Sequence, residues 1–198
     1  MLLCSYVVTK DYGFAPNPFW GYCTVATCTP NHQDVRLDAG DWIMGHSPKD
    51  DGRRLIYAMK VAETLDYNEY FHDERFQAKK PRRSDTWMEQ CGDNIYSRCR
   101  EGSWRQHFTI FHDDDVLRSK DARYHKVFIS EQFYYFGENL RPIPSRFSSL
   151  LVGRCGCKKR HDQDTVDKFV KWMLSHLEQG VHGGPRHLDE WKKDPSTR

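Results

Sequence analysis

The chain has 198 residues, of which 38% are hydrophobic and 29% charged, and its mean hydropathy is −0.83. This length suits one domain with a single core, and no apolar run approaches the roughly 18 residues that a membrane-spanning helix needs. The formal net charge of +2 excludes a surface that is basic throughout, so any basic surface for nucleic acid must be local.

Strand patterns dominate the first third of the chain. Residues rich in β-branched and aromatic side chains, bounded by turn residues, predict strands over 3–9, 22–29, 42–45 and 54–65. A short helix is predicted to follow over 66–72, because Asp66 is a suitable N-cap and Glu69 stands at capping-box spacing.

The pattern weakens between residues 75 and 123, where 104–111 is the one candidate strand, and a clear strand pattern returns over 126–136. An amphipathic helix is then predicted over 164–179. Its apolar stripe consists of Val166, Phe169, Val170, Met173, Leu174 and Leu177. These elements indicate a single α+β domain over residues 1–180, followed by a loosely packed tail over 181–198.

The segment between the first two predicted strands carries most of the functional signal. It places Phe14, Phe19 and Trp20 in a loop, where large apolar side chains need a reason beyond core packing. Prolines and glycines in the same segment predict a rigid loop that either caps the core or forms one wall of a pocket. A nucleobase suits such a wall because its π-face stacks on aromatic rings.

Several stretches of the sequence resemble the nucleotide modification associated domain 2 family, which is linked to modified-nucleotide systems of phages and bacteria. They are YVVTKDYGFAPNPFWGYCTVATC at 6–28, AGDWIMGHS at 39–47, RLIYAMKVAETL at 54–65, FQAKKP at 76–81, GDNIY at 92–96 and ISEQFYYFG at 129–137. The GDWI turn at 40–43 is also similar, more distantly, to the Gly-Asp turn of EVE, ASCH and other PUA-like domains. These resemblances imply a PUA-like curved β-barrel with flanking short helices, and recognition of a modified nucleotide or base in phage nucleotide modification or antiphage defence.

A set of residues from these stretches is predicted to contact the ligand. Aromatic rings would stack on the base, and the amide of Asn17 would read its edge because an amide both donates and accepts. The full set is Asn17, Phe19, Trp20, Trp42, Ser47 and Tyr135. Core packing is the alternative role for the aromatic rings, and ordinary turn chemistry is the alternative for the polar side chains.

The basic run over 79–83 supplies candidates for phosphate contacts, in Lys80, Arg82 and Arg83. A solvated charged loop is the alternative interpretation of this run.

Catalytic motifs are missing from the sequence. There is no Gly-x-Ser-x-Gly, no phosphate-binding loop, no His-Glu-x-x-His and no deaminase signature. The sequence leaves open the alternative of an active site assembled from Asp11, His46 and Asp93. The sequence therefore favours a binding module for a modified nucleotide or nucleic acid. The alternatives are an enzyme acting on the same ligands and a module that docks a protein partner through the aromatic loop.

The cysteines raise the questions of metal binding and of cellular location. Cys155, Cys157 and His161 lie close in sequence, but the Cys-x-Cys spacing is tighter than that of common zinc sites and no second pair matches it. We therefore predict no metal and no cofactor. Seven cysteines in irregular spacing, with no leader-like pattern at the start, predict reduced thiols and a cytoplasmic protein.

Overall fold

The computed structural model describes residues 1–27, 35–84, 86–111, 121, 123, 125–153 and 157–189, and it has the α+β character that the sequence predicts. The helices are α1 (Tyr67–His72), α2 (Trp87–Gln90) and α4 (Gln163–His176), with 3-10 helices η1 (Lys49–Asp51), η2 (Glu74–Lys79) and η3 (Ser145–Leu150). The strands are β1 (Leu3–Val7), β2 (Cys23–Val25), β3 (Trp42–His46), β4 (Leu55–Lys60), β5 (Glu63–Asp66), β6 (Tyr96–Arg98), β7 (Trp104–Gln106), β8 (Lys126–Ser130), β9 (Gln132–Tyr135), β10 (Cys157–Lys158) and β11 (Gly180–Val181).

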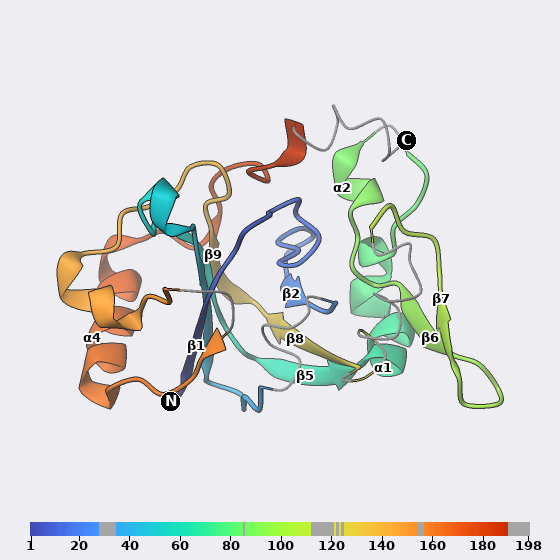
Figure 1. Ribbon diagram of the computed structural model, residues 1–198. Helices are drawn as coiled ribbons and strands as arrows, with labels where there is room; N and C mark the ends of the chain where they lie inside the picture. The colour runs from blue at the N-terminus through green and yellow to red at the C-terminus, as the bar shows by residue number, and fades with distance from the viewer. Residues whose placement is uncertain are drawn as a thin grey trace.

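The described strands form three sheets. The six-stranded sheet has the order β10-β1-β3-β4-β9-β11, the three-stranded sheet has the order β2-β8-β5, and β6 pairs with β7 in a hairpin. In the large sheet β1 is parallel to β3 and β11 is parallel to β9, while the other neighbours are antiparallel. Figure 1 shows α4 on one side of the large sheet and the three-stranded sheet on the other, with α1 and the hairpin beyond it.

Three apolar clusters fill the spaces between these layers. The cluster between the two larger sheets includes Tyr6, Ile43, Ile56, Met59 and Phe128. A second cluster joins the opposite face of the large sheet to η3 and α4 and includes Leu3, Trp42, Tyr134, Phe147 and Phe169. The third packs α1 and η2 on the three-stranded sheet and includes Tyr67, Tyr70, Phe76, Val127 and Ile129. The central strands are therefore apolar on both faces.

The predicted N-terminal signals of the two helices are confirmed. Asp66 accepts the backbone N–H of Asn68, and its own N–H donates to Glu69, which completes the capping box of α1. Helix α4 begins after Asp162, which caps the N–H of Thr165 at 2.9 Å. Its predicted stripe is narrower than expected, because Leu174 at its edge is exposed.

Two predicted strands are each divided between sheets. The range 54–65 forms β4 and β5, and the range 126–136 forms β8 and β9. Since β4 pairs with β9 and β5 pairs with β8, both segments cross from one sheet to the other at the same place. The N–H of Ala62 still donates to the carbonyl of Ile129 at this corner. Apolar alternation continues through the corner, so the sequence pattern does not mark it.

The first residues after α4, where the sequence predicts a loosely packed tail from residue 181, contact the edge of the large sheet. Strand β11 adds to the edge of the large sheet, and the backbone N–H of His182 donates to the carbonyl of Tyr135 at 2.8 Å. Gly183 permits this path because a Cβ there would lie 2.5 Å from the carbonyl oxygen of Phe136. Residues 190–198, the remainder of the predicted tail, lie outside the described residues.

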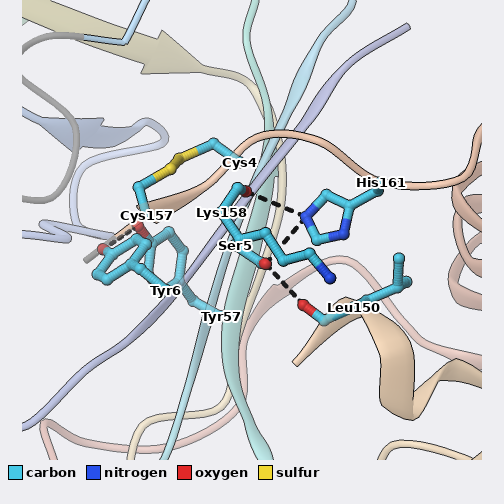
Figure 2. The surroundings of a disulfide bond; sticks show 8 residues. All are labelled: Cys4, Ser5, Tyr6, Tyr57, Leu150, Cys157, Lys158 and His161. Carbon is cyan, nitrogen blue, oxygen red and sulfur yellow. Dashed lines mark hydrogen bonds between the residues drawn. A yellow bond between two sulfur atoms is a disulfide. The ribbon is translucent and has the colours of Figure 1, made fainter. Parts of the chain in front are cut away.

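The prediction of reduced cysteines is corrected by a disulfide between Cys4 and Cys157. Strands β1 and β10 are antiparallel neighbours and bring the two Cα atoms within 6.1 Å of each other, although 153 residues separate them. Figure 2 shows the disulfide on one face of β1 and Ser5 on the other, where its hydroxyl donates to the carbonyl of Leu150. Among the described residues, every helix is too short or too polar to span a bilayer.

Candidate functional site

The loop between β1 and β2 holds a buried carboxylate. Asp11 is 1% exposed, and each of its oxygens lies 2.9 Å from the hydroxyl of Tyr135 on β9. The backbone N–H groups of Gly13 and Arg186 also donate to it, at 3.2 and 3.3 Å. Burial raises the pKa of Asp11, and these hydrogen bonds oppose the rise because they favour the charged form.

The segment after β11 closes over this carboxylate. His187 makes two hydrogen bonds to the backbone of Asp11. Its ring Nδ1 accepts from the N–H of Asp11 at 3.0 Å, and its backbone N–H donates to the carbonyl of Asp11 at 2.9 Å. Arg186 reaches η1 and pairs with Asp51 at 2.7 Å. Asp11 is thus held between β9, its own loop and the C-terminal segment.

Glycine at position 13 makes the close packing possible. Gly13 has a φ of +74°, and a Cβ added there would lie 2.8 Å from Pro185 and 3.1 Å from Phe19. Both the left-handed backbone and the close approach require a residue without a side chain. The glycine therefore lets the aromatic loop and the C-terminal segment meet beside Asp11.

A lysine with no exposed surface lies beneath the same loop. The ammonium of Lys79, at the end of η2, donates to the carbonyl and side-chain oxygens of Asn17 at 3.0 and 2.7 Å and to the carbonyl of Tyr22 at 2.9 Å. Burial lowers its pKa to about 8. The amide nitrogen of Asn17 donates to the carbonyls of Gly13 and Cys91, so the whole side chain has protein partners.

A second buried carboxylate, Asp93, lies near this lysine. The hydroxyls of Tyr70 and Thr24 donate to its two oxygens, each at 2.7 Å. Burial raises the pKa of Asp93, while the charge of Lys79 acts to lower it. Burial also raises the pKa of the Cys23 thiol, which responds to the charges of Lys79, Asp93 and Asp11. Asp93 and Lys79 therefore act on each other directly, and Asp11 acts with them on the same buried thiol.

We call this group the buried polar cluster; it consists of Asp11, Asn17, Thr24, Tyr70, Lys79, Asp93 and Tyr135. Ionisable groups are costly to bury, so a core that served packing alone would avoid them. Side chains whose pKa is shifted by desolvation together with a specific charge partner are typical of functional sites. The cluster can hold charge and position the loop above it, and burial brings the pKa of Lys79 to about 8.

Trp20 lies above the cluster in an unusual conformation. Its φ is +56°, which is rare for a bulky side chain, and the next residue, Gly21, also has a positive φ. Its ring is half-buried, meets the edge of Phe19 and has the Lys79 ammonium 6.0 Å from its centre. Residues held in sparsely populated backbone conformations concentrate at ligand-binding sites.

The structure brings together several of the predicted site residues. Asp11, Asn17, Asp93 and Tyr135 belong to the buried polar cluster, and Phe19 and Trp20 lie in the loop that covers it.

Three other predicted residues lie elsewhere. Trp42 is 1% exposed and stacks with Tyr134 on the face of the sheet that α4 covers. His46 is buried, with Nδ1 2.8 Å from the carbonyl of Ser47 and Nε2 accepting from Val152, and burial lowers its pKa. Ser47 closes the η1 turn. Each has the contacts of a structural residue.

The basic run contributes to two different surroundings. Lys79 points into the cluster, whereas the ammonium of Lys80 lies 3.7 Å above the ring of Phe71. Arg82 pairs with Glu89 at 2.8 Å, and Arg83 lies over the ring of Phe108. The predicted phosphate residues therefore lie outside the buried polar cluster.

Sequence reasoning missed four residues of this region: Thr24, Tyr70, Lys79 and His187. Lys79 lies in the basic run over 79–83, and His187 lies in the predicted tail over 181–198. A usable signal lay in FQAKKP at 76–81 and GDNIY at 92–96, which carry Lys79 and Asp93 and match the family pattern.

The disulfide removes Cys157 from the candidate metal ligands. Cys157 is bonded to Cys4, and Cys155 lies outside the described residues. His161 lies 3.1 Å from the hydroxyl of Ser5 and 3.0 Å from the carbonyl of Lys158. Within the described ranges, no three His, Cys, Asp or Glu side chains are grouped to hold a metal ion.

Comparison with known proteins identifies the family. No curated protein and no solved structure matches the chain. A family model described as nucleotide modification associated domain 2 matches residues 2–194, which include the aromatic loop, the buried polar cluster and the segment that closes over Asp11. The chain therefore belongs to the nucleotide modification associated domain 2 family.

Proposed function

We propose that this protein binds a modified nucleotide or base, free or within nucleic acid, as part of phage nucleotide modification or of a defence that senses it. Membership of the family associates the chain with nucleotide modification. The observation that carries the binding role is Trp20, a half-buried ring in left-handed backbone conformation above a buried lysine. In this proposal the base stacks on Trp20, and Phe19 supports the ring from its edge.

The other predicted residues take supporting roles in the proposal. The side chain of Asn17 has protein partners at both its oxygen and its nitrogen, so we assign it to positioning the loop rather than to reading the base edge. Tyr135 on β9 likewise has a positioning role, because its hydroxyl donates to the Asp11 carboxylate. The PUA-like curved barrel and the cytoplasmic location stay predictions.

A titration against free modified and unmodified nucleotides and short oligonucleotides tests the proposal. Stacking of one base on an aromatic ring contributes about 1–3 kcal/mol, so Trp20→Ala should weaken binding about 10- to 100-fold. Trp172 on α4 is also half-buried but lies beyond the opposite face of the large sheet, so Trp172→Ala is the matched control. Equal affinity in wild type and Trp20→Ala would reject the stacking role, and binding of no member of the panel would favour a protein partner.

A second candidate function, an enzyme acting on the same ligands, is favoured by the ionisation of the cluster. The pKa of Lys79 is about 8, and the pKa of Asp11 and of Asp93 is raised by burial. Groups that titrate near the working pH are suited to proton transfer. Incubation with each bound nucleotide, followed by mass spectrometry, would reveal a product. An enzyme should lose turnover in Asp11→Asn while keeping most of its substrate affinity.

A further inference from the structure

A basic hollow lies at the β6–β7 hairpin, away from the buried polar cluster. It has a volume of about 340 Å³ and is lined by Ser97, Arg98, Cys99, Arg100, Glu101 and Arg105. Three of these side chains are guanidinium groups and one is a carboxylate. Arg98 is partly engaged, since it lies 4.3 Å from the centre of the Trp104 ring and 3.8 Å from Asp66. Within the described part of the chain, Arg100 and Arg105 make no ion pair within 4.0 Å, although the charge of Arg105 acts on Glu101.

Aromatic and basic side chains continue from this hollow along the hairpin. The rings of Phe71 and His107 stack with centres 4.3 Å apart, and the Lys80 ammonium lies 3.7 Å from the centre of the Phe71 ring. The pKa of His107 is lowered by burial and by the nearby charges of Arg105, Lys80 and His72. Lys80, which follows η2, and Arg105 on β7 therefore both lie near the His107 ring.

An exposed ring completes this surface. Phe108, directly after His107, is 37% exposed, and the guanidinium of Arg83 lies 5.5 Å from its centre. We call the whole surface the hairpin face and define it by Phe71, Lys80, Arg100, Arg105, His107 and Phe108.

We infer that the hairpin face binds the backbone of single-stranded nucleic acid. Guanidinium groups without carboxylate partners suit phosphate, which they contact with two parallel hydrogen bonds. The exposed ring of Phe108, with the Arg83 guanidinium over it, suits an unpaired base, whereas the bases of a duplex are already stacked on one another. Alternating cationic and aromatic groups are the arrangement that single-strand binding proteins use.

This inference rests on the proposed function for its class of ligand and extends it from a nucleotide to a strand. Lys79 and Lys80 are consecutive, and one belongs to the buried polar cluster while the other belongs to the hairpin face. Consecutive Cα atoms are about 3.8 Å apart. The end of η2 therefore connects the buried polar cluster to the hairpin face, and a nucleic-acid strand bound on the hairpin face would lie close to the loop above the cluster.

Fluorescence anisotropy with a labelled single-stranded oligonucleotide of about 12 nucleotides tests the inference, because such sites cover about 4–16 nucleotides. The variant is Arg100→Glu with Arg105→Glu. The control is Arg146→Glu with Lys171→Glu, which changes the charge equally at exposed side chains of η3 and α4. For single strands the slope of log K against log salt is about −0.7 per phosphate contact, so the hairpin variant should flatten it by about 1.4. At low salt we expect at least a tenfold loss of affinity, with the control unchanged.

A second variant keeps the aromatic part of the inference testable. Phe108→Ala should weaken binding of the oligonucleotide about tenfold and leave its salt dependence unchanged, because a stacking contact releases no counterions. Equal losses in the hairpin and control variants would overturn the inference. So would tighter binding of a duplex of the same length than of the single strand.

The two proposals fail separately. If mononucleotides bind through Trp20 and the oligonucleotide binds no more tightly than they do, the inference is wrong and the proposed function stands. If the oligonucleotide binds through Arg100 and Arg105 while mononucleotide binding ignores Trp20→Ala, the strand site stands and the stacking proposal is wrong.

Discussion

The hydroxyl of Tyr135 lies 2.9 Å from each carboxylate oxygen of Asp11, and this contact joins the large sheet to the aromatic loop across 124 positions of sequence. The same carboxylate also binds the backbone of Arg186 in the C-terminal segment. Three distant parts of the chain therefore meet at one buried group. The loop that carries Trp20 depends on this meeting point for its position.

Removal of the hydroxyl should destabilise the protein. Tyr135→Phe leaves a buried carboxylate with fewer donors, and hydrogen bonds to charged groups contribute about 1.5–3 kcal/mol. The matched control is Tyr134→Phe, because Tyr134 is the next residue of β9, is equally buried and packs by its ring against Trp42. We expect urea denaturation to show a loss of about 2 kcal/mol for Tyr135→Phe and less than about 0.5 kcal/mol for the control. Equal losses would assign Tyr135 to packing alone.

Trp20 should contribute little to stability. A non-glycine residue in the left-handed region costs about 1–2 kcal/mol, and asparagine adopts this region more readily than tryptophan. In Trp20→Asn this relief offsets the lost contacts with Phe19, so we expect a change of within about 1 kcal/mol by urea denaturation. Trp42→Asn at a buried site should cost more than about 3 kcal/mol. A comparable cost at both positions would make Trp20 a core residue.

Local signals in the sequence predicted the local structure well. The capping box at Asp66 and the stripe of α4 depend on neighbouring residues, and the structure confirms the box and all of the stripe but its exposed edge at Leu174. The corner between β4 and β5 could not be read, because apolar alternation is the same whether a strand stays in one sheet or crosses to another. The packing of His187 on Asp11 was equally hidden, since it depends on a contact between residues 176 positions apart.

The candidate site could be predicted only where a residue's type is informative without its distant contacts. The aromatic loop, Asp11 and Asp93 have residue types that suggest chemistry on their own, and the structure places them around one cluster. Lys79 has a type that is almost always exposed, so only the fold reveals that it is buried. For Trp42 the sequence leaves base stacking and core packing as alternatives, and its ring packs in the cluster beneath α4.

The disulfide should stabilise the protein strongly. It closes a loop that spans 153 positions, for which the loss of chain entropy in the unfolded state predicts about 5 kcal/mol. We expect a reducing agent to lower the urea midpoint of the wild type and to leave that of Cys4→Ala with Cys157→Ala unchanged. A peptide map made without reduction should contain the Cys4 and Cys157 peptides as a linked pair. Recovery of the two peptides only as separate thiols would contradict the pairing.

Ionisation of Lys79 should leave a signature in the pH dependence of stability. Its pKa is about 8 in the folded protein and about 10.5 in an unfolded chain, so between these values the unfolded state binds more protons. Stability therefore rises with pH across this window, and the contribution of Lys79 should increase by about 2 kcal/mol between pH 7 and pH 9.5.

The buried thiols act in the opposite direction, so the comparison must isolate the lysine. Burial raises the pKa of Cys91 to about 12, and an unfolded thiol loses its proton near pH 8.5, which lowers stability over the same window. The difference in unfolding free energy between wild type and Lys79→Met removes this common term, and that difference should grow by about 2 kcal/mol with rising pH. Lys80→Met, at the neighbouring half-buried ammonium, should show smaller growth, because burial also lowers the pKa of Lys80 but leaves it partly exposed. A flat difference for Lys79→Met would mean that the lysine keeps its ordinary pKa and is not desolvated beneath the loop.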